Sequence, residues 1–273
     1  MRKTACMEFE SIRYAVADRI ATITFDRPDR LNALSPEMIR ELRVAYEQAE
    51  ADPDVWILLV TGNGRAFCAG ADVSDISDDG RVVYEAQYLS TNAQWEAPQE
   101  GTPPFRTMTK PILTAVNGLC CGAGLDLVTT GDIVIASDRA EFFDPHVSIG
   151  LVSGREMVRL ARALPTNIAM RFALMGKHER MSAQRAYELG LVSEVVEHDH
   201  LLERAREIAA IVNRNAPLAV RGPRLAIRRG RDLPLHEAEI MAEAFRERVV
   251  RTDDAKEGPR AFLDKRDPVW RCE

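Results

Sequence analysis

Two turns rich in small residues, each directly after a predicted strand, constrain this chain more than any other feature. One is the run GNGRAFCAGAD over residues 62–72, and the other is NGLCCGAGLDL over residues 117–127. Small residues let a backbone approach a ligand closely and leave its amide groups available as donors. Either turn alone is a weak signal, but together they predict a ligand site built from main-chain groups.

Two nucleotide-binding motifs also use glycine-rich turns, and the sequence fits neither of them. A Walker phosphate loop needs a lysine followed by Ser or Thr, and that pair is absent from both turns. The dinucleotide fingerprint needs a third spaced glycine and a βαβ unit at the chain start, whereas Gly122-Ala123-Gly124 lacks both. The turns therefore favour another kind of ligand.

Alternating strand and helix patterns around the turns predict an α/β core with crossover connections. Ser35 is a predicted N-cap, followed by Pro36 in the first turn of a helix that ends at Asp52-Pro53. The apolar run over 55–61 is typical of a strand covered on both faces. The other predicted elements are strands over 20–25, 112–116 and 133–137, and a helix from 122 to about 130.

From residue 155 onward, apolar residues recur at helical spacing, with a helix over 182–189 closed by Gly190. We predict a core domain over residues 1–200 and a helical region over 201–273. The late helices have two open interpretations, an oligomer interface or ordinary core and lid helices. The polar segment 74–108 is predicted to form a helix and loop beside the site.

Charge and composition exclude several kinds of partner. The 273 residues carry a net charge of −6 without a basic run, which argues against nucleic acid. The apolar runs fall short of the ~20 residues that span a bilayer, and no apolar stretch follows the first basic residues. Five cysteines without C-x-x-C spacing indicate buried thiols and no metal site. We expect a cytoplasmic protein that contacts no membrane.

Five ordered segments resemble the crotonase family, the enoyl-CoA hydratases and isomerases, over nearly the whole chain. The segments are RP with NAL over 27–34, AFCAGAD over 66–72, KPILTAVNGLCCGAGLDLVTTGD over 110–132, RMSA to GLV over 180–192, and AF to KR over 261–266. The resemblance implies a spiral of repeated ββα units with a helical C-terminal oligomerisation region. It also implies an acyl-CoA thioester substrate, no cofactor beyond the coenzyme A of that substrate, and a homotrimer or dimer of trimers.

The resemblance assigns the main-chain amides of Ala71 and Ala123 as the two donors that hold the thioester oxygen. Two fixed donors stabilise an enolate oxygen by about 3–4 kcal/mol each. The family's second donor is typically glycine, but an alanine amide donates equally. The implied coenzyme A contacts are Arg27 or Arg30, Ala33, Ala69, Asp72, Val73, Gly122, Phe262 and Lys265, the last two from the same or a neighbouring subunit.

The sequence departs from a standard hydratase at both catalytic glutamates. Asp126 stands at the first position and His146 at the second, so they are the candidate proton carriers, with His146 pairing with Asp126 or Asp144. Glu156 is a further candidate. Three hypotheses remain open: a hydratase or isomerase, a non-catalytic acyl-CoA-binding protein, and another reaction such as thioester hydrolysis, decarboxylation or dehydration.

Overall fold

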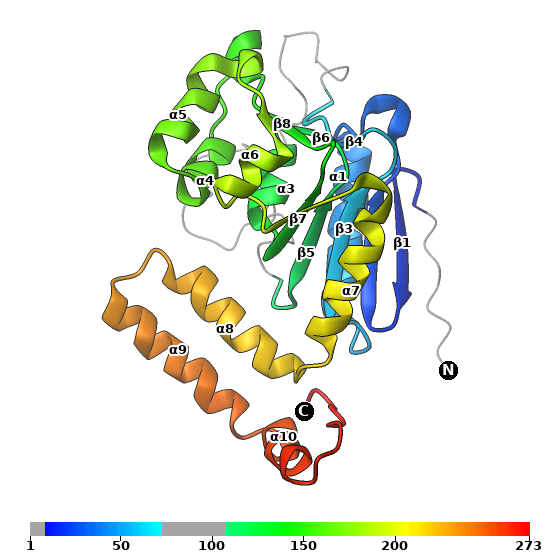
Figure 1. Cartoon of the computed structure of the whole chain (residues 1–273), viewed down its shortest axis with the longest axis vertical. Helices are drawn as coiled ribbons and strands as arrows, with labels where there is room; N and C mark the ends of the chain where they lie inside the picture. Colours follow the sequence, from blue (N-terminus) through cyan, green and yellow to red (C-terminus); the bar gives the residue numbers. More distant parts are fainter. Residues whose placement is uncertain (1–8, 73–107) are drawn as a thin grey trace.

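A six-stranded sheet forms the centre of the protein (Figure 1) in a computed structural model that describes residues 9–72 and 108–273. The strand order is β1-β2-β3-β5-β7-β10, with β1 and β2 antiparallel and the other neighbours parallel. The strands are β1 (Ile12–Ala17), β2 (Ile20–Phe25), β3 (Ile57–Gly62), β5 (Ile112–Val116), β7 (Ile133–Ser137) and β10 (Glu194–Val196). Three predicted strands are confirmed, and the fourth begins at Ile57, two residues later than expected.

A second sheet of four short strands lies beside the first, in the order β4-β6-β8-β9. Its strands are β4 (Ala66–Cys68), β6 (Leu119–Cys121), β8 (Glu141–Phe143) and β9 (Met181–Ser182). Strands β4, β6 and β8 directly follow β3, β5 and β7 along the chain, so each turn of the backbone adds one strand to each sheet. This is the predicted spiral of ββα units. Strands of two or three residues carry too little hydrophobic pattern to be predicted.

Helices cover both faces of the large sheet. The helix α7 (Leu201–Asn213) packs on one face, where Leu201, Ala205 and Ala209 meet the alternate buried residues of β3, β5 and β7. The helix α1 (Pro36–Ala51) packs on the opposite face and is capped by Ser35, whose side chain accepts from the Met38 amide at 3.2 Å. Burial on both faces explains the unbroken apolar run in β3.

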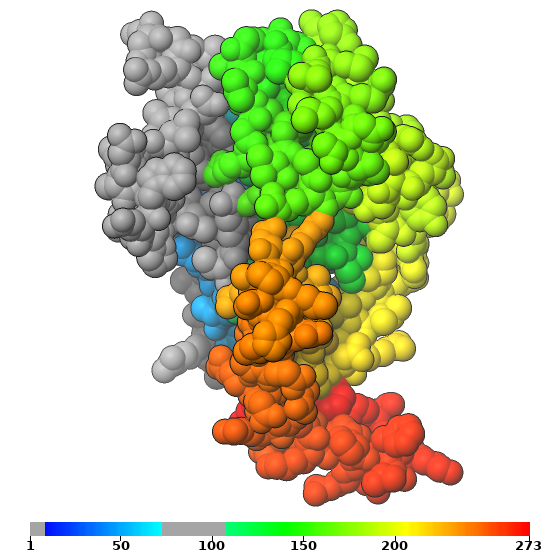
Figure 2. All heavy atoms as spheres, turned by 90° about the vertical axis from the view of Figure 1, so that its left-hand side faces the viewer, coloured from blue at the N-terminus to red at the C-terminus, as the bar shows by residue number. Residues whose placement is uncertain are grey.

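Apart from α3, the remaining α-helices lie from residue 155 onward, where the chain is mostly helical, as predicted, and is interrupted by the short strands β9 and β10; two of these helices extend away from the body. The helices are α3 (Gly124–Thr130), α4 (Arg155–Ala163), α5 (Thr166–Met175), α6 (Ala183–Glu188), α8 (Pro217–Gly230), α9 (Leu235–Val249) and α10 (Asp253–Leu263). Figure 1 shows α8 and α9 side by side as an arm below the body, with α10 at its lower end. Figure 2 shows α9, in orange, along the outside of the molecule. Among the described helices, none combines the length and apolarity of a membrane span.

The predicted buried thiols are confirmed at three positions. Cys68, Cys120 and Cys121 are free and buried, and burial raises the pKa of the Cys68 and Cys121 thiols to about 12. Thiols with such pKa values stay protonated near neutral pH and are poor nucleophiles. The predicted helix and loop over 74–108 and the candidate Val73 lie almost wholly outside the described residues.

Asn32 connects, through hydrogen bonds of its side chain, the loop around Arg27 with the turn over residues 62–72. Its side chain is fully buried, donates to Asn63 O at 2.9 Å and to Ala66 O at 2.8 Å, and accepts from the Arg27 amide at 2.9 Å. Replacing Asn32 by Ala removes these partners from the Arg27 amide and from Asn63 O, and leaves Ala66 O with Asn117 Nδ2, at 3.1 Å. We expect a loss of about 2–4 kcal/mol in the free energy of unfolding, measured by urea denaturation. An unchanged midpoint would contradict this role, and Asn215→Ala on the exposed surface is the matched control.

Candidate active site

The two motif segments around residues 31–34 and 69–72 pair as short parallel strands. Leu34 N donates to Gly70 O at 2.8 Å, and Asp72 N donates to Leu34 O at 3.1 Å, forming a bridge between Leu34 and Ala71. In this parallel pairing the hydrogen bonds to Leu34 are made by Gly70 and Asp72, the residues on either side of Ala71. Among the described residues the Ala71 amide has no acceptor, as an oxyanion donor requires.

The two glycine-rich turns meet at Gly70, which brings the candidate donors to one place. Gly70 has a φ of +88°, and a Cβ added there would lie 3.0 Å from Cys121 O and 3.4 Å from Ala123 N. Only glycine fits this approach without strain. Ala123 is the N-cap of α3, and its amide has no acceptor in the described part of the chain. The structure thus places Gly70, the residue before Ala71, against the amide of Ala123.

The candidate coenzyme A residues near the first turn divide into two groups. Arg27 has a structural role, since its guanidinium donates to Ala33 O at 2.5 Å and pairs with Asp72 at 2.9 Å. Asp72 is therefore a partner of Arg27, a role that the sequence did not predict. Arg30 is exposed in the short helix Pro28–Arg30 and has no ion pair within the described residues, so it is the better placed to meet a phosphate. Ala69 is partly exposed.

His146 lies against the second turn and is oriented by a carboxylate. A Cβ added to Gly122, whose φ is +53°, would lie 3.5 Å from His146 Cε1. His146 Nδ1 is 2.6 Å from Asp144 Oδ1, and the His146 amide donates to the same oxygen at 2.8 Å. The proton therefore belongs on Nδ1, which leaves Nε2 as the basic nitrogen. Of the two predicted partners, the structure selects Asp144.

The Asp144 carboxylate is almost fully buried and still ionised. Burial alone raises the pKa of this carboxyl, but the hydrogen bonds from His146 to Oδ1 help to outweigh it, and the pKa lies below its ordinary value. A lowered pKa means that ionised Asp144 stabilises the fold above the ordinary value of about 3.9 and that this stability is lost as the pH falls below it. Oδ2 has no hydrogen-bond partner among the described residues.

Asp126 is held by an arginine that the sequence did not identify. Asp126 is buried in α3, and its Oδ1 lies 3.2 Å from Arg159 Nη1 of α4. The Arg159 guanidinium is thus the charged partner of this carboxylate. Glu156, also buried in α4, has its Oε2 3.5 Å from Ser153 Oγ. No pattern in SGREMVRL distinguished Arg159 from a surface arginine.

Phe262 and Lys265 do not reach the turns within one chain. Phe262 lies on α10 with 83% of its surface exposed, and Lys265 follows that helix. Figure 1 places α10 at the lower end of the molecule and β4, β6 and β8 at the upper end. In the described residues, no three His, Cys, Asp or Glu side chains gather as a possible metal site.

Two main-chain amides beside a carboxylate-oriented imidazole suit proton transfer next to a carbonyl group. Comparison with known proteins identifies the class. The family model for enoyl-CoA hydratase/isomerase matches residues 16–273. The chain belongs to the enoyl-CoA hydratase/isomerase family, and it is an acyl-CoA-transforming enzyme.

Similar proteins cover almost the whole chain. A crystal structure of an enoyl-CoA hydratase/isomerase from Mycobacterium paratuberculosis is 69% identical, with a TM-score of 0.87 over 97% of this chain and 99% of that chain. The (E)-benzylidenesuccinyl-CoA hydratase of Thauera aromatica is 34% identical over 94% of this chain and 97% of the relative. The 2,3-dehydroadipyl-CoA hydratase of Escherichia coli is 32% identical over 93% of this chain and 95% of the relative.

Proposed function

We propose that the enzyme hydrates a 2-enoyl-CoA thioester with His146 as its base. The observation that carries the proposal is the 2.6 Å contact between His146 Nδ1 and Asp144, made beside the turn that holds Ala123. Relatives whose names denote hydratases support the same reaction.

In the proposed reaction, His146 Nε2 removes a proton from water as the water oxygen bonds to Cβ of the substrate. The electrons of the double bond move through Cα to the thioester oxygen, where the amides of Ala71 and Ala123 stabilise the negative charge. The imidazolium returns the proton to Cα, which completes the addition of water. Asp126, which pairs with Arg159 at 3.2 Å, accepts a hydrogen bond from the water, and the reaction needs no cofactor beyond the substrate's coenzyme A.

A panel of acyl-CoA thioesters tests the reaction. Purified protein is incubated with 2-enoyl-CoA and 3-enoyl-CoA substrates of several chain lengths, and the products are analysed by mass spectrometry. We expect 2-enoyl-CoA to gain the mass of one water. Double-bond migration without added water would indicate an isomerase, release of free coenzyme A would indicate a thioesterase, and binding without conversion would indicate a non-catalytic protein. Each of these results would overturn the proposed hydration.

Replacing Asp144 by Asn tests how the base is oriented. The amide oxygen of Asn still accepts from the His146 amide and from Nδ1, so the tautomer is kept while the charge is lost. A neutral acceptor is about half as strong as a carboxylate, so we expect kcat to fall about tenfold. Loss of the carboxylate also lowers the imidazole pKa, so the lower-pH limb of the kcat profile moves to lower pH. An unchanged profile would show that Asp144 is only structural.

The proposal includes assembly into a homotrimer or a dimer of trimers. Its support is the apolar surface of the α8–α10 region, where Ile227, Leu235, Ile240, Phe262 and Leu263 are all more than half exposed. Exposed apolar residues gathered on one region typically mark an interface. A neighbouring subunit would also bring Phe262 and Lys265 to a coenzyme A that one chain cannot reach with them. Size-exclusion chromatography with light scattering measures the assembly, while the cytoplasmic location stays a prediction.

A further inference from the structure

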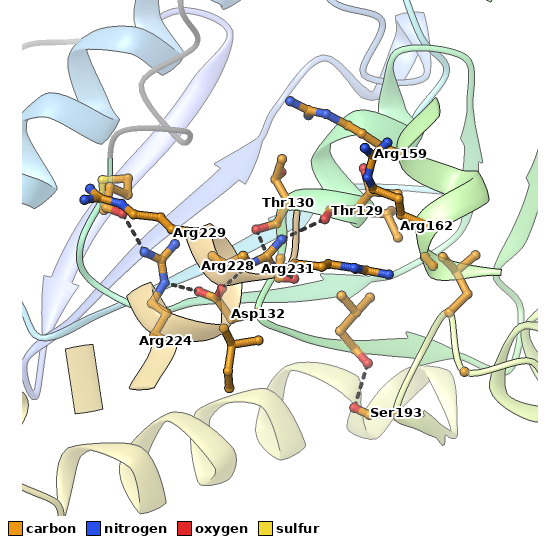
Figure 3. A pocket seen from close by; sticks show the side chains of 18 of the residues that line it. Thr129, Thr130, Asp132, Arg159, Arg162, Ser193, Arg224, Arg228, Arg229 and Arg231 are labelled. Carbon is orange, nitrogen blue, oxygen red and sulfur yellow. Dashed lines mark hydrogen bonds and ion pairs between the residues drawn. The ribbon is translucent and has the colours of Figure 1, made fainter. Parts of the chain in front are cut away.

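A cavity of about 790 Å³ lies between the end of α3, the helix α4 and the helix α8 (Figure 3). Its lining contains two carboxylates, Asp132 and Asp232, against six guanidinium groups. The six are Arg159, Arg162, Arg224, Arg228, Arg229 and Arg231. Because the whole chain carries a net charge of −6, this surplus of positive charge is a local feature. Such a concentration attracts anions.

Two of the arginines have a structural role. Arg224 and Arg228 pair with Asp132 at 2.6 Å and 2.8 Å, as the dashed lines in Figure 3 show. Arg228 also donates to the carbonyls of Thr129 and Thr130 at the end of α3. These contacts attach α8 to the body and leave the other four guanidinium groups to be explained.

Three of the remaining four arginines are weakly engaged. Arg162 pairs with Asp232 at 2.9 Å, but both side chains are about half exposed or more, so solvent weakens the pair. Arg229 lies over the Phe245 ring at 6.0 Å. In the described residues Arg231 has no carboxylate partner, and Figure 3 shows its side chain extending to the same side of the view as Arg162, away from Arg229. Arg231 is thus placed to receive a ligand.

Arg159 connects this cavity with the active site. Its guanidinium lines the cavity and also contacts Asp126 of α3, the helix that begins at the Ala123 donor. Four arginines of the cavity already pair with a carboxylate: Arg159, Arg162, Arg224 and Arg228. The planar guanidinium group matches the geometry of a carboxylate. We propose that this cavity binds a carboxylate-bearing small molecule through Arg231, Arg162 and Arg159.

The carboxylate has two possible sources. It is either the far end of an acidic acyl group whose thioester lies at the Ala71 and Ala123 amides, or a separate dicarboxylate. The first source rests on the proposed function, whereas binding of a carboxylate to the cavity does not.

Calorimetric titration of the purified protein with succinate, at constant ionic strength, tests the site without catalysis. We expect binding that weakens as salt is raised, and at least about tenfold weaker binding by Arg231→Gln, which loses charge-assisted hydrogen bonds. The control Arg185→Gln, on α6 and outside the cavity, should bind like the wild type. Absence of succinate binding, equal binding by Arg231→Gln, or tighter binding of inorganic phosphate would each overturn the proposal.

Kinetics then identify the source. Two 2-enoyl-CoA substrates of equal length are compared, one ending in a carboxylate and one in a methyl group. If the acyl group supplies the carboxylate, Arg231→Gln raises KM only for the acidic substrate, and succinate competes with that substrate alone. If a separate dicarboxylate is bound, the substitution affects both substrates equally. A lack of turnover with both would overturn the proposed function and leave the calorimetric result standing.

Discussion

Replacing His146 by Ala is expected to lower kcat for the hydrated substrate by about 10²- to 10⁴-fold, the usual contribution of a positioned general base. The physical reason is that the His146 imidazole has a carboxylate partner at 2.6 Å and lies against Gly122, the residue before the Ala123 donor. Asp126 does not easily replace it, because its Oδ1 already contacts Arg159 Nη1 at 3.2 Å. Steady-state rates at saturating substrate measure the effect.

The control for this substitution is His178→Ala, since His178 is an exposed histidine on another part of the surface. His146→Gln adds a second comparison, because glutamine keeps much of the volume and polarity of the side chain without a basic nitrogen. Both His146 variants should bind the acyl-CoA product with near wild-type affinity. A His146→Ala enzyme that retains more than about a tenth of the wild-type kcat would exclude His146 as the base.

The arrangement of the donor turns could be predicted from sequence because it depends on residue size at fixed positions. Gly70 must approach Cys121 O and Ala123 N, so the small-residue pattern around it is visible in the chain itself. Four strands of the large sheet were equally accessible, because strands such as β3 carry continuous apolar runs, whereas β1 and β10 were not predicted.

The partners of the titratable groups were less accessible to prediction. Asp126 and Asp144 both suited His146 by residue type, and only the folded geometry shows Asp144 turned toward it and Asp126 paired with Arg159. The arginine cavity was missed for a related reason. Its arginines come from α4, from α8 and from Arg231 just after α8, segments far apart in the sequence, and single arginines on helices are typical of solvated surfaces.

Replacing Ala123 by Pro is expected to lower kcat by about 10²- to 10³-fold, the usual cost of removing one oxyanion donor. Proline deletes the amide hydrogen and keeps the main chain, since Ala123 has a φ of −59° and proline requires about −65°. The residue is the N-cap of α3, where proline interrupts no helical hydrogen bond. The fold, followed by circular dichroism and thermal unfolding, should therefore persist.

Ala123→Gly is the matched control, because it alters the side chain and retains the donor. We expect this variant to keep kcat within a fewfold of the wild type, whereas a side-chain role for Ala123 would make both substitutions harmful. Binding of the acyl-CoA product separates lost transition-state stabilisation from a blocked site, since blocking would weaken binding and kcat together. A folded Ala123→Pro enzyme with wild-type kcat would rule out this amide as an oxyanion donor.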